Sequence, residues 1–298
     1  MHSTEIVLKL AGKTAQRSLN TISLIARQFV IKVMKLLVEE TLLGKIDKEK
    51  IAIQRCIEFQ NKNPENKNIL AFSGGKDSVV AYDIIKRSGI EFTPIYSRTS
   101  VDPPEVIWLM NEHYPEIVKQ KYRVNKKGRI VTMWELLSNR AMPPTRVARY
   151  CCQELKERTG NPGDTVFTGQ RWAESDTRRS QSMVNFYMKK IMVRPLVDWS
   201  DEDIWEYIHK YNIPYCNLYD EGWNRLGCIG CPLGKNQRRE LEAYPKYKAM
   251  YIRCFDKMIE YRKSKDMPTE WKTGEEVLEW WISQNKKQKN IEGQCSMF

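Results

Sequence analysis

Short apolar runs alternate with longer amphipathic stretches through the middle of the chain. Residues 68–72 (NILAF) form such a run and end close to a pair of glycines, after which the apolar positions of SVVAYDIIKR recur at helical spacing. Further strands are predicted in FTPIYS and in DTVFTG, and a helix is predicted after Pro103 and Pro104. Because strands that alternate with helices usually pair in parallel, the pattern predicts an α/β fold in which a parallel sheet carries helices on both faces.

The N-terminal part of the chain is expected to contain an extension and one helix. Between residues 35 and 61 the apolar side chains recur at helical spacing, which predicts an N-terminal helix within residues 34–67. Residues 1–33 are basic, carry one acidic side chain and lack a sustained apolar centre. They fit either a transit peptide or an upstream extension of a chain whose true start is Met34, and we favour the second account.

The last third of the chain is predicted to be helical. WSDEDIWEYIHKYNIP begins with a capping box formed by Ser200 and Asp203, and KYKAMYIRCFDKMIEYRK and TGEEVLEWWISQNKK also have helical periodicity. The predicted organisation is therefore an α/β domain over residues 68–234, followed by a helical C-terminal extension with a mobile tail over residues 235–298.

Composition narrows the functional classes. The chain has 298 residues with a formal net charge of +12, which favours anionic partners such as nucleotides, sulfate or phosphate esters, or nucleic acid. No apolar run approaches the length of a membrane span, so no membrane association is expected. Eight cysteines are too few for a disulfide scaffold of this length, and no signal peptide is recognised. We therefore expect a cytoplasmic protein in which clustered cysteines are metal ligands or reactive thiols.

The sharpest local signal is the loop SGGKDS, which follows the first predicted strand of the domain. In an open α/β sheet, ligands bind at the carboxyl ends of the strands, where a turn leads into the N-terminus of a helix. The glycines let backbone N–H groups face a phosphate, the lysine adds a cation, and the serine hydroxyls add donors. The spacing differs from that of a Walker A motif. The predicted phosphate-binding residues are Ser73, Gly74, Gly75, Lys76, Asp77 and Ser78.

Two arginines lie just beyond the strand predicted in DTVFTG, at the end of the sheet where ligands bind. Guanidinium groups match the oxygens of phosphate or sulfate bidentately, which makes Arg171 and Arg178 candidate catalytic residues. The acidic residues of DWSDEDIW are expected to stabilise a helix start through the helix dipole, so Asp198, Asp201 and Asp203 are assigned no catalytic role.

Four cysteines form the second candidate site. Cys228 and Cys231 lie in RLGCIGCPLG, where glycines let the backbone wrap a metal centre, and Cys151 and Cys152 are adjacent in the sequence. Two C-x-x-C pairs at a shorter separation would be typical of a zinc ribbon. Adjacent thiols suit a single tetrahedral ion poorly but can reach two different irons of a cubane. We favour a [4Fe–4S] cluster, with zinc or a dithiol as the alternatives.

Four stretches, in order, resemble one protein family over about residues 68–234. SGGKDS resembles the pyrophosphate-binding loop of the nucleotide α-hydrolase group. TGQRWAESDTRRS is similar to the Gly-x-Arg-x-x-x-Ser-x-x-Arg stretch of the phosphoadenylylsulfate (PAPS) reductase family, and TSVDPPEV and the segment from RPLVDWSDEDIW to GCIGC also resemble that family. The cysteine pattern resembles that of the adenylylsulfate reductases that bear a [4Fe–4S] cluster. The Gly-x-Arg stretch maps onto Gly169, Arg171, Ser175 and Arg178.

The resemblance implies an enzyme that binds adenylylsulfate or PAPS and reduces it to sulfite. The phosphosulfate would lie on the loop and on Arg171 and Arg178, with Ser175 as a further binding residue. In the reductases a cysteine on a C-terminal tail accepts the sulfonate, and thioredoxin or glutathione then releases sulfite. Cys295 is the candidate for this nucleophile, although the Glu-Cys-Gly-Leu-His setting found in the reductases is absent from this chain.

Two other functions remain open. The double glycine of the loop is the form found in ATP-using members of the group. It implies an enzyme that cleaves ATP between its α- and β-phosphates, with Mg²⁺ as cofactor, and adenylates an acceptor for sulfur insertion, as in DNA phosphorothioation. The other alternative is a basic nucleic-acid-binding module that uses a cysteine metal site as a structural clip. This last function is the least favoured, because it leaves the phosphate loop without a role.

Overall fold

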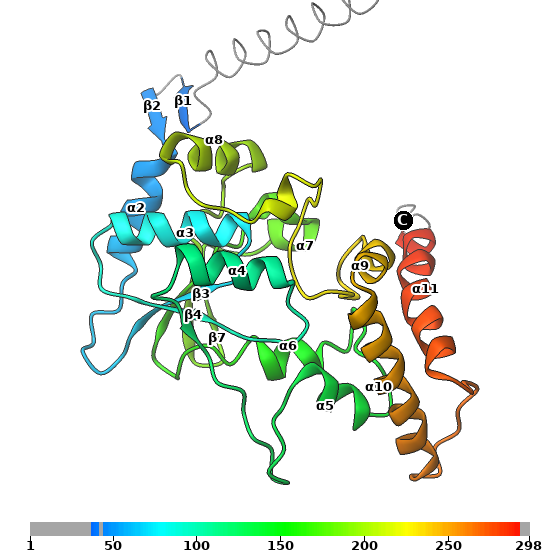
Figure 1. Cartoon of the computed structure of the whole chain (residues 1–298). Helices are drawn as coiled ribbons and strands as arrows, with labels where there is room; N and C mark the ends of the chain where they lie inside the picture. Colours follow the sequence, from blue (N-terminus) through cyan, green and yellow to red (C-terminus); the bar gives the residue numbers. More distant parts are fainter. Residues whose placement is uncertain (1–36, 42–43, 293–298) are drawn as a thin grey trace, which may run out of the picture. The chain divides into compact units, whose positions relative to one another are not determined.

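The computed structural model describes residues 37–41 and 44–292, in a chain that divides into two compact units between Ile51 and Ala52. In the larger unit a six-stranded sheet has the order β5-β4-β3-β6-β8-β7 (Figure 1). Neighbouring strands in this sheet are parallel except β7 with β8. The strands are β3 (Asn68–Phe72), β4 (Thr93–Tyr96), β5 (Val118–Lys119), β6 (Thr165–Phe167), β7 (Val184–Tyr187) and β8 (Lys190–Val193).

Helices flank the sheet and continue into the C-terminal part of the chain (Figure 1). The predicted α/β fold with a helical C-terminal extension is therefore confirmed. In the described ranges, no helix has the length and apolar character needed to cross a membrane. The α-helices are α2 (Lys48–Glu58), α3 (Lys76–Arg87), α4 (Pro104–His113), α5 (Met133–Ser138), α6 (Tyr150–Leu155), α7 (Asp176–Arg179), α8 (Asp201–Tyr211), α9 (Gln237–Ala243), α10 (Pro245–Lys263) and α11 (Gly274–Glu292).

The centre of the sheet is built from a continuous apolar run. β3 pairs with β4 on one side and with β6 on the other, so that Ile69 lies opposite both Thr93 and Val166. Leu70 of β3 and Val79 of α3 are fully buried. A strand that is paired on both sides and covered by helices needs apolar side chains at successive positions, which explains why NILAF lacks polar alternation. The loop at the carboxyl end of β3 thereby starts from a buried strand that is paired on both sides.

The helix predicted over residues 35–61 begins later than expected. α2 starts at Lys48, and the residues before it form an antiparallel hairpin of β1 (Val38–Thr41) and β2 (Gly44–Asp47) in the smaller unit. Gly44 has a φ of +123°, which lies outside helical geometry. The helical prediction is therefore wrong for both strands, where backbone pairing overrides the spacing of the apolar residues.

A second hairpin, formed by β7 and β8, is absent from the pattern-based prediction. Met188 and Lys189, the residues between the two strands, have φ values of 49° and 60°. Two consecutive left-handed residues form a tight turn that matches the twist of the strands, and Asn-Gly is its usual sequence signal. Met-Lys lacks that signal. Phe186, an apolar residue of β7, is 79% exposed, so the apolar positions of this strand do not mark a buried face from which it could be predicted.

The C-terminal helices share a second apolar core with α5 and α6. α10 and α11 pack against each other, and their side chains Tyr251, Phe255 and Trp281 are at most 1% exposed. The indole Nε1 of Trp281 donates to the carbonyl of Pro144 at 2.6 Å, which satisfies a polar atom that would otherwise be buried without a partner. Cys151 belongs to the same core, so the C-terminal helices support the helix that carries the adjacent cysteines.

Candidate functional site

The loop SGGKDS lies between the carboxyl end of β3 and the N-terminus of α3. Gly74 has a φ of +75°, and a Cβ atom added to it would lie 2.4 Å from Cγ1 of Val106 in α4. A side chain at this position would be strained and would displace α4. Gly75 is the N-cap of α3 and has no capping side chain of its own, so the positive end of the helix dipole lies at the loop.

Two hydrogen bonds hold the loop in place, one with Tyr219 and one inside the loop. Tyr219 Oη accepts from the backbone N–H of Lys76 at 2.9 Å, and Ser78 Oγ donates to the carbonyl of Gly75 at 2.8 Å. Ser78 is only 3% exposed, whereas Ser73 is exposed at the surface of the loop. Of the two serines predicted to bind phosphate, Ser73 is therefore accessible, and Ser78 is engaged in holding the turn.

Lys76 and Arg171 share two carboxylates beside the loop. Lys76 Nζ lies 2.8 Å from Asp201 Oδ1 and 3.3 Å from Asp77 Oδ1. Arg171 donates through Nε to Asp77 Oδ1 and through Nη2 to Asp201 Oδ1, each at 2.6 Å. Burial opposes the ionisation of Asp201, but the hydrogen bonds and charges of Lys76 and Arg171 outweigh it and lower the pKa of this carboxyl. The four side chains form one charged cluster.

Arg171 lies at the base of this cluster. Its side chain is 1% exposed, and Nη1 donates to the carbonyl of Trp199 at 2.8 Å. In the structure the guanidinium thus contacts protein groups and fixes the positions of Asp77 and Asp201. Its direct contact with a phosphate, as expected from the sequence, stays a prediction.

Asp201 is a site residue that sequence reasoning missed. It is the first residue of α8, where the predicted capping box is present: the N–H of Asp203 donates to Ser200 Oγ at 3.1 Å, and the N–H of Ser200 donates to Asp203 Oδ2 at 2.7 Å. Asp201 instead contacts Lys76 and Arg171. The first turn of α8 is acidic throughout, so no local signal distinguishes Asp201 from its neighbours.

The Gly-x-Arg stretch meets the loop through a close approach of two backbones. A Cβ atom on Gly169 would lie 2.6 Å from the carbonyl oxygen of Asp77, so only glycine fits at this position. Ser175 is exposed and is the N-cap of the short helix α7. Arg178 in α7 forms an ion pair with Glu174, and its side chain is 25% exposed. The structure brings Gly169 to the loop and leaves Ser175 and Arg178 on the adjoining segment.

The four predicted metal-ligating cysteines lie in two segments that meet. Cys151 and Cys152 are in α6, and the N–H of Cys231 donates to the carbonyl of Cys228 at 3.1 Å in a tight turn. All four are free thiols. Cys151 belongs to the second apolar core, and Cys152 and Cys228 pack against the same core. A hydrogen bond with Cys152, burial, and the negative charges of the other three cysteines raise the pKa of Cys151. Cys295, the candidate nucleophile, lies outside the described residues.

Positive charge lies close to these thiols. The negative charge of Cys228 raises the pKa of Lys156, against the opposing effect of burial. The hydrogen bond from Cys151, followed by the charges and hydrogen bonding of Lys156 and Arg149, lowers the pKa of Cys152 to about 6. Within residues 37–41 and 44–292, no three or more Cys, His, Asp or Glu side chains have the arrangement of a metal site. The chemistry of the donor set, four thiols with cationic neighbours, nevertheless fits a thiolate-bound centre.

The loop and the cysteines lie at the same edge of the sheet. The segment after β4 connects them: the N–H of Ile229 donates to the carbonyl of Val101 at 2.8 Å, and the thiol of Cys228 donates to Thr99 Oγ1 at 3.5 Å. The same segment leads into α4, which packs on the loop. The two candidate sites are therefore neighbours at the carboxyl ends of β3 and β4.

The chain is similar to an uncharacterized protein and to two proteins named as reductases of adenosine phosphosulfates. It is 27% identical to an uncharacterized protein of Methanocaldococcus jannaschii over 74% of this chain and 54% of the other. It is 26% identical to an adenosine 5'-phosphosulfate reductase of Shouchella clausii over 59% of this chain and 75% of that one. A shorter match, 38% identical over 26% of this chain, links it to a phosphoadenosine 5'-phosphosulfate reductase of Xylella fastidiosa, of which it covers 33%. The chain thus spans about half the length of the first of these relatives.

The solved structures that match the chain include the phosphoadenylyl-sulfate reductase of Candida auris in its phosphate complex. That match has a TM-score of 0.43 and 16% identity, and covers 61% of this chain and 88% of the other. The family model of the phosphoadenosine phosphosulfate reductase domain matches residues 67–233, and these include the loop, the Gly-x-Arg stretch and all four clustered cysteines. Because this match covers more than half of the chain, the protein belongs to the phosphoadenosine phosphosulfate reductase domain family.

Proposed function

We propose that this protein binds adenylylsulfate or PAPS and reduces the sulfonate to sulfite with a thiol donor. The observation that carries the proposal is the glycine loop at the N-terminus of α3, with Lys76 fixed beside it and four thiols at the same edge of the sheet. Backbone N–H groups at a helix N-terminus and a fixed ammonium group are suited to the phosphate of a nucleotide. The neighbouring thiols are suited to chemistry on sulfur.

The reaction begins with attack of a thiolate on the sulfonate. A bond forms between the thiolate sulfur and the sulfonate sulfur, the bond from that sulfur to the bridging oxygen breaks, and the adenine nucleotide leaves with the electron pair on its phosphate. A second thiol, from thioredoxin or glutathione, then forms a disulfide with the first sulfur and releases sulfite. Cys295 is the proposed first nucleophile. Lys76, with Arg178 at the adjoining segment, would stabilise the charge on the departing phosphate.

The four clustered cysteines would hold a [4Fe–4S] cluster, with zinc as the alternative metal. A bound cluster would supply a redox-capable, negatively charged centre beside the substrate. Lys156 and Arg149 would balance that charge, and the Cys228–Cys231 turn would be fixed to α6. Each of these roles uses residues that already lie together in the described structure.

Asp77 and Asp201 favour a second candidate function. Two carboxylates beside a phosphate loop are the oxygen ligands that Mg²⁺ uses when it accompanies a nucleotide triphosphate. In this version ATP is cleaved between its α- and β-phosphates, the loop holds the departing pyrophosphate, and the acceptor of a sulfur atom is adenylated. The two functions share the loop and differ in whether a carboxylate-bound metal or a thiol completes the site.

One experiment separates the two functions. The full chain and its Cys295→Ser variant are incubated with adenylylsulfate, PAPS, or ATP with Mg²⁺, and sulfite and pyrophosphate are quantified. The reductase proposal predicts sulfite from a phosphosulfate nucleotide, and its loss in Cys295→Ser with nucleotide affinity unchanged by calorimetry. Pyrophosphate from ATP in both proteins, without sulfite from either phosphosulfate nucleotide, would support the adenylating function and reject the reductase.

A further inference from the structure

Most of the net charge of the chain is concentrated in one segment. Residues 119–158 carry eleven Lys or Arg side chains against three Glu, a net charge of +8, whereas the whole chain carries +12. The proposed reaction uses only the two cysteines of this segment and the side chains next to them. The remaining positive charge is far more than one nucleotide requires, and a polyanion is the usual partner of such a surface.

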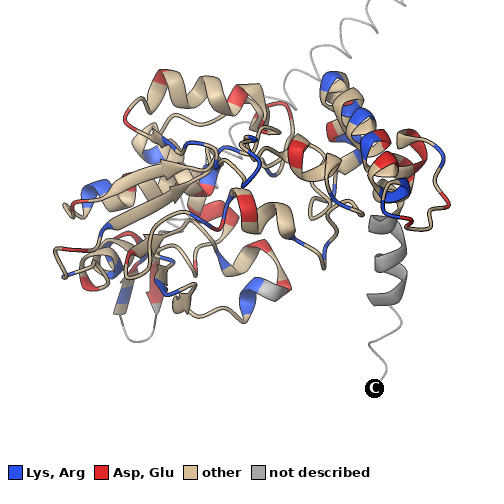
Figure 2. Cartoon of the chain, turned by 90° about the horizontal axis from the view of Figure 1, so that it is seen from below, with Lys and Arg blue, Asp and Glu red and all other residues tan. Residues whose placement is uncertain are grey.

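The first part of this segment is a basic hairpin. Val124 and Ile130 form an antiparallel bridge, the N–H of Asn125 donates to the carbonyl of Arg129 at 2.8 Å, and Gly128 turns the chain with a φ of +75°. In Figure 1 it is the green loop that extends downward beside α5, and Figure 2 shows Lys and Arg in blue from that side. The basic side chains of the hairpin and its preceding residues are all exposed: Lys119, Lys121, Arg123, Lys126, Lys127 and Arg129.

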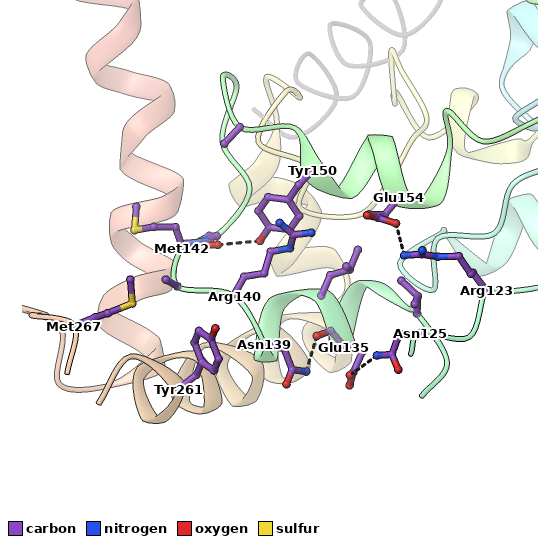
Figure 3. Close-up of a pocket in the computed structure, with 15 residues that line it drawn as sticks. Arg123, Asn125, Glu135, Asn139, Arg140, Met142, Tyr150, Glu154, Tyr261 and Met267 are labelled. Atoms are coloured by element: carbon purple, nitrogen blue, oxygen red, sulfur yellow. Dashed lines mark hydrogen bonds and ion pairs between the residues drawn. The ribbon is translucent and has the colours of Figure 1, made fainter. Parts of the chain in front are cut away.

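A cavity of about 580 Å³ opens between this hairpin and helices α5, α6 and α10. In Figure 3 the ring of Tyr150 lies in the middle of it, with the guanidinium of Arg140 4.3 Å from the ring centroid. The hydroxyl of Tyr150 donates to the carbonyl of Met142 at 2.9 Å, which fixes the ring plane. The side-chain amides of Asn125 and Asn139 lie at the rim, where each donates one N–H to Glu135 and keeps a second N–H for an incoming acceptor.

The acidic side chains of the cavity are already compensated. Glu154 accepts from Arg123 Nη2 at 2.6 Å and from Arg158 Nη2 at 2.9 Å. Glu135 lies 3.6 Å from Arg129. The guanidinium of Arg140 contacts the Tyr150 ring and has no carboxylate partner in the described part of the chain. The lining itself carries two arginines and two glutamates, and the flanking Arg129 and Arg158 bring the charge around the cavity to +2.

We propose that this surface binds single-stranded nucleic acid, with the backbone along the basic hairpin and one unstacked base in the cavity against Tyr150. A base has a flat π-face for an aromatic ring and an arginine, and edge atoms for the amides at the rim. An acidic protein would match the charge, but it would not use a cavity built around an aromatic ring and a guanidinium. Because Tyr150 immediately precedes Cys151, the bound base lies beside the helix that carries the adjacent thiols.

The test is binding of fluorescein-labelled oligonucleotides of about 20 nucleotides, as DNA and as RNA, to the purified full chain by fluorescence anisotropy. The affinity should fall steeply between about 50 and 200 mM salt. Lys126→Glu with Lys127→Glu should weaken binding by at least about tenfold and reduce the slope of log affinity against log salt by about 1.4, for two phosphate contacts on a single strand. The matched control is Lys62→Glu with Lys67→Glu. These two exposed lysines precede the amino end of β3, whereas the basic hairpin follows the carboxyl end of β5, and the control should bind nearly as well as the parent.

The base pocket has its own variants. Tyr150→Ala should weaken binding by about 5- to 150-fold, and Tyr150→Phe should retain it, because stacking needs the ring and not the hydroxyl. Arg140→Gln should also weaken binding. Because Arg140 is exposed, this variant tests the pocket without removing the ring of Tyr150.

Four outcomes would overturn the proposal. The first is absence of binding at low salt, and the second is an equal loss of affinity in the Lys62→Glu, Lys67→Glu control. The third is unchanged affinity in both Tyr150→Ala and Arg140→Gln. The fourth is that polyglutamate competes as effectively as unlabelled oligonucleotide at equal charge. Preference for RNA or for DNA identifies the source of the strand, and either one supports the surface. None of these measurements requires the proposed reaction, so the two proposals fail separately.

Discussion

The carboxylate of Asp201 accepts hydrogen bonds from Lys76 and Arg171, which lie 125 and 30 residues away in the sequence. Arg171 is enclosed by protein, so its charge depends on Asp77 and Asp201 for compensation rather than on water. The side chain of Asp201 is 58% exposed, whereas that of Asp77 is 23% exposed. A buried cation thus holds one exposed and one partly buried carboxylate beside the lysine.

Removing the buried charge should destabilise the fold. Arg171→Met leaves the carbonyl of Trp199 without this donor and Asp77 with Lys76 alone, and we expect the free energy of unfolding to fall by about 3 kcal/mol, as measured by urea denaturation. Arg178→Met is the matched control, because its partly exposed pair with Glu174 contributes less than about 1 kcal/mol. Equal losses in the two variants would contradict the role assigned to Arg171.

The contiguous parts of the site could be predicted from the sequence, and the assembled parts could not. Residues 73–78 and the cysteine pairs are recognisable because their spacing along the chain is itself the signal. Tyr219 and Asp201 contact Lys76 across 143 and 125 residues, so only the folded sheet brings them to the loop. The burial of Arg171 follows from the same assembly, since its sequence context resembles that of an exposed arginine.

The N-terminus of α3 is held between two neighbouring elements. On one side Gly74 leaves room for Val106 of α4, and on the other Gly169 at the end of β6 lies against the backbone of Asp77. Neither contact involves a hydrogen bond that could adapt its length. The direction in which the first turn of α3 points is therefore set by van der Waals contact on both sides.

Gly169→Ala should displace this helix start. The added Cβ would lie 2.6 Å from the carbonyl oxygen of Asp77, and overpacking of this kind costs on the order of 1–3 kcal/mol. We expect a lower melting temperature together with weaker nucleotide binding. Gly227→Ala is the matched control, because its Cβ would meet nothing within 4 Å. A Gly169→Ala protein that melts and binds like the control would show that the helix start can shift without cost.

Elements with a regular pattern of buried residues or with a capping motif can be predicted from the sequence. Elements that depend on antiparallel pairing between two strands cannot. β3, α3 and α8 have apolar runs or caps that match their final environment, and each is found within a few residues of its predicted place. The apolar spacing of the β1–β2 hairpin predicts a helix, because such spacing does not reveal an antiparallel partner. The β7–β8 hairpin turns on two non-glycine residues with positive φ, a conformation that the sequence does not announce.

At the scale of the molecule, the C-terminal helices and the cysteines form one structural unit. The hydroxyl of Tyr251 in α10 donates to the carbonyl of Ile229 at 2.8 Å, between Cys228 and Cys231. Gly230 in the same turn packs against Leu241 of α9, with space for no side chain. Helices far from the sheet therefore hold the turn that faces α6.

Removal of the proposed cluster should lower the stability of the protein as well as its iron content. If the four cysteines hold a [4Fe–4S] cluster, protein purified without oxygen should contain about four iron and four sulfide per chain, and chelation should lower its melting temperature. Serine at any one of the four positions should reduce the iron content. Cys216→Ser is the control, because Cys216 is buried elsewhere with its thiol directed to Asn217. One equivalent of zinc without sulfide would contradict the cluster.

The two edges of the sheet end in different ways. β5 has only two residues, Val118 and Lys119, and it leads into the basic hairpin. β7 has four residues and reverses direction against β8. Intermolecular β-pairing needs a long, flat row of unpaired N–H and C=O groups, and a short lysine-bearing strand or a short reversed strand offers little of one. The parallel sheet at the centre of the protein is thereby shielded from growing into aggregates when the protein is concentrated.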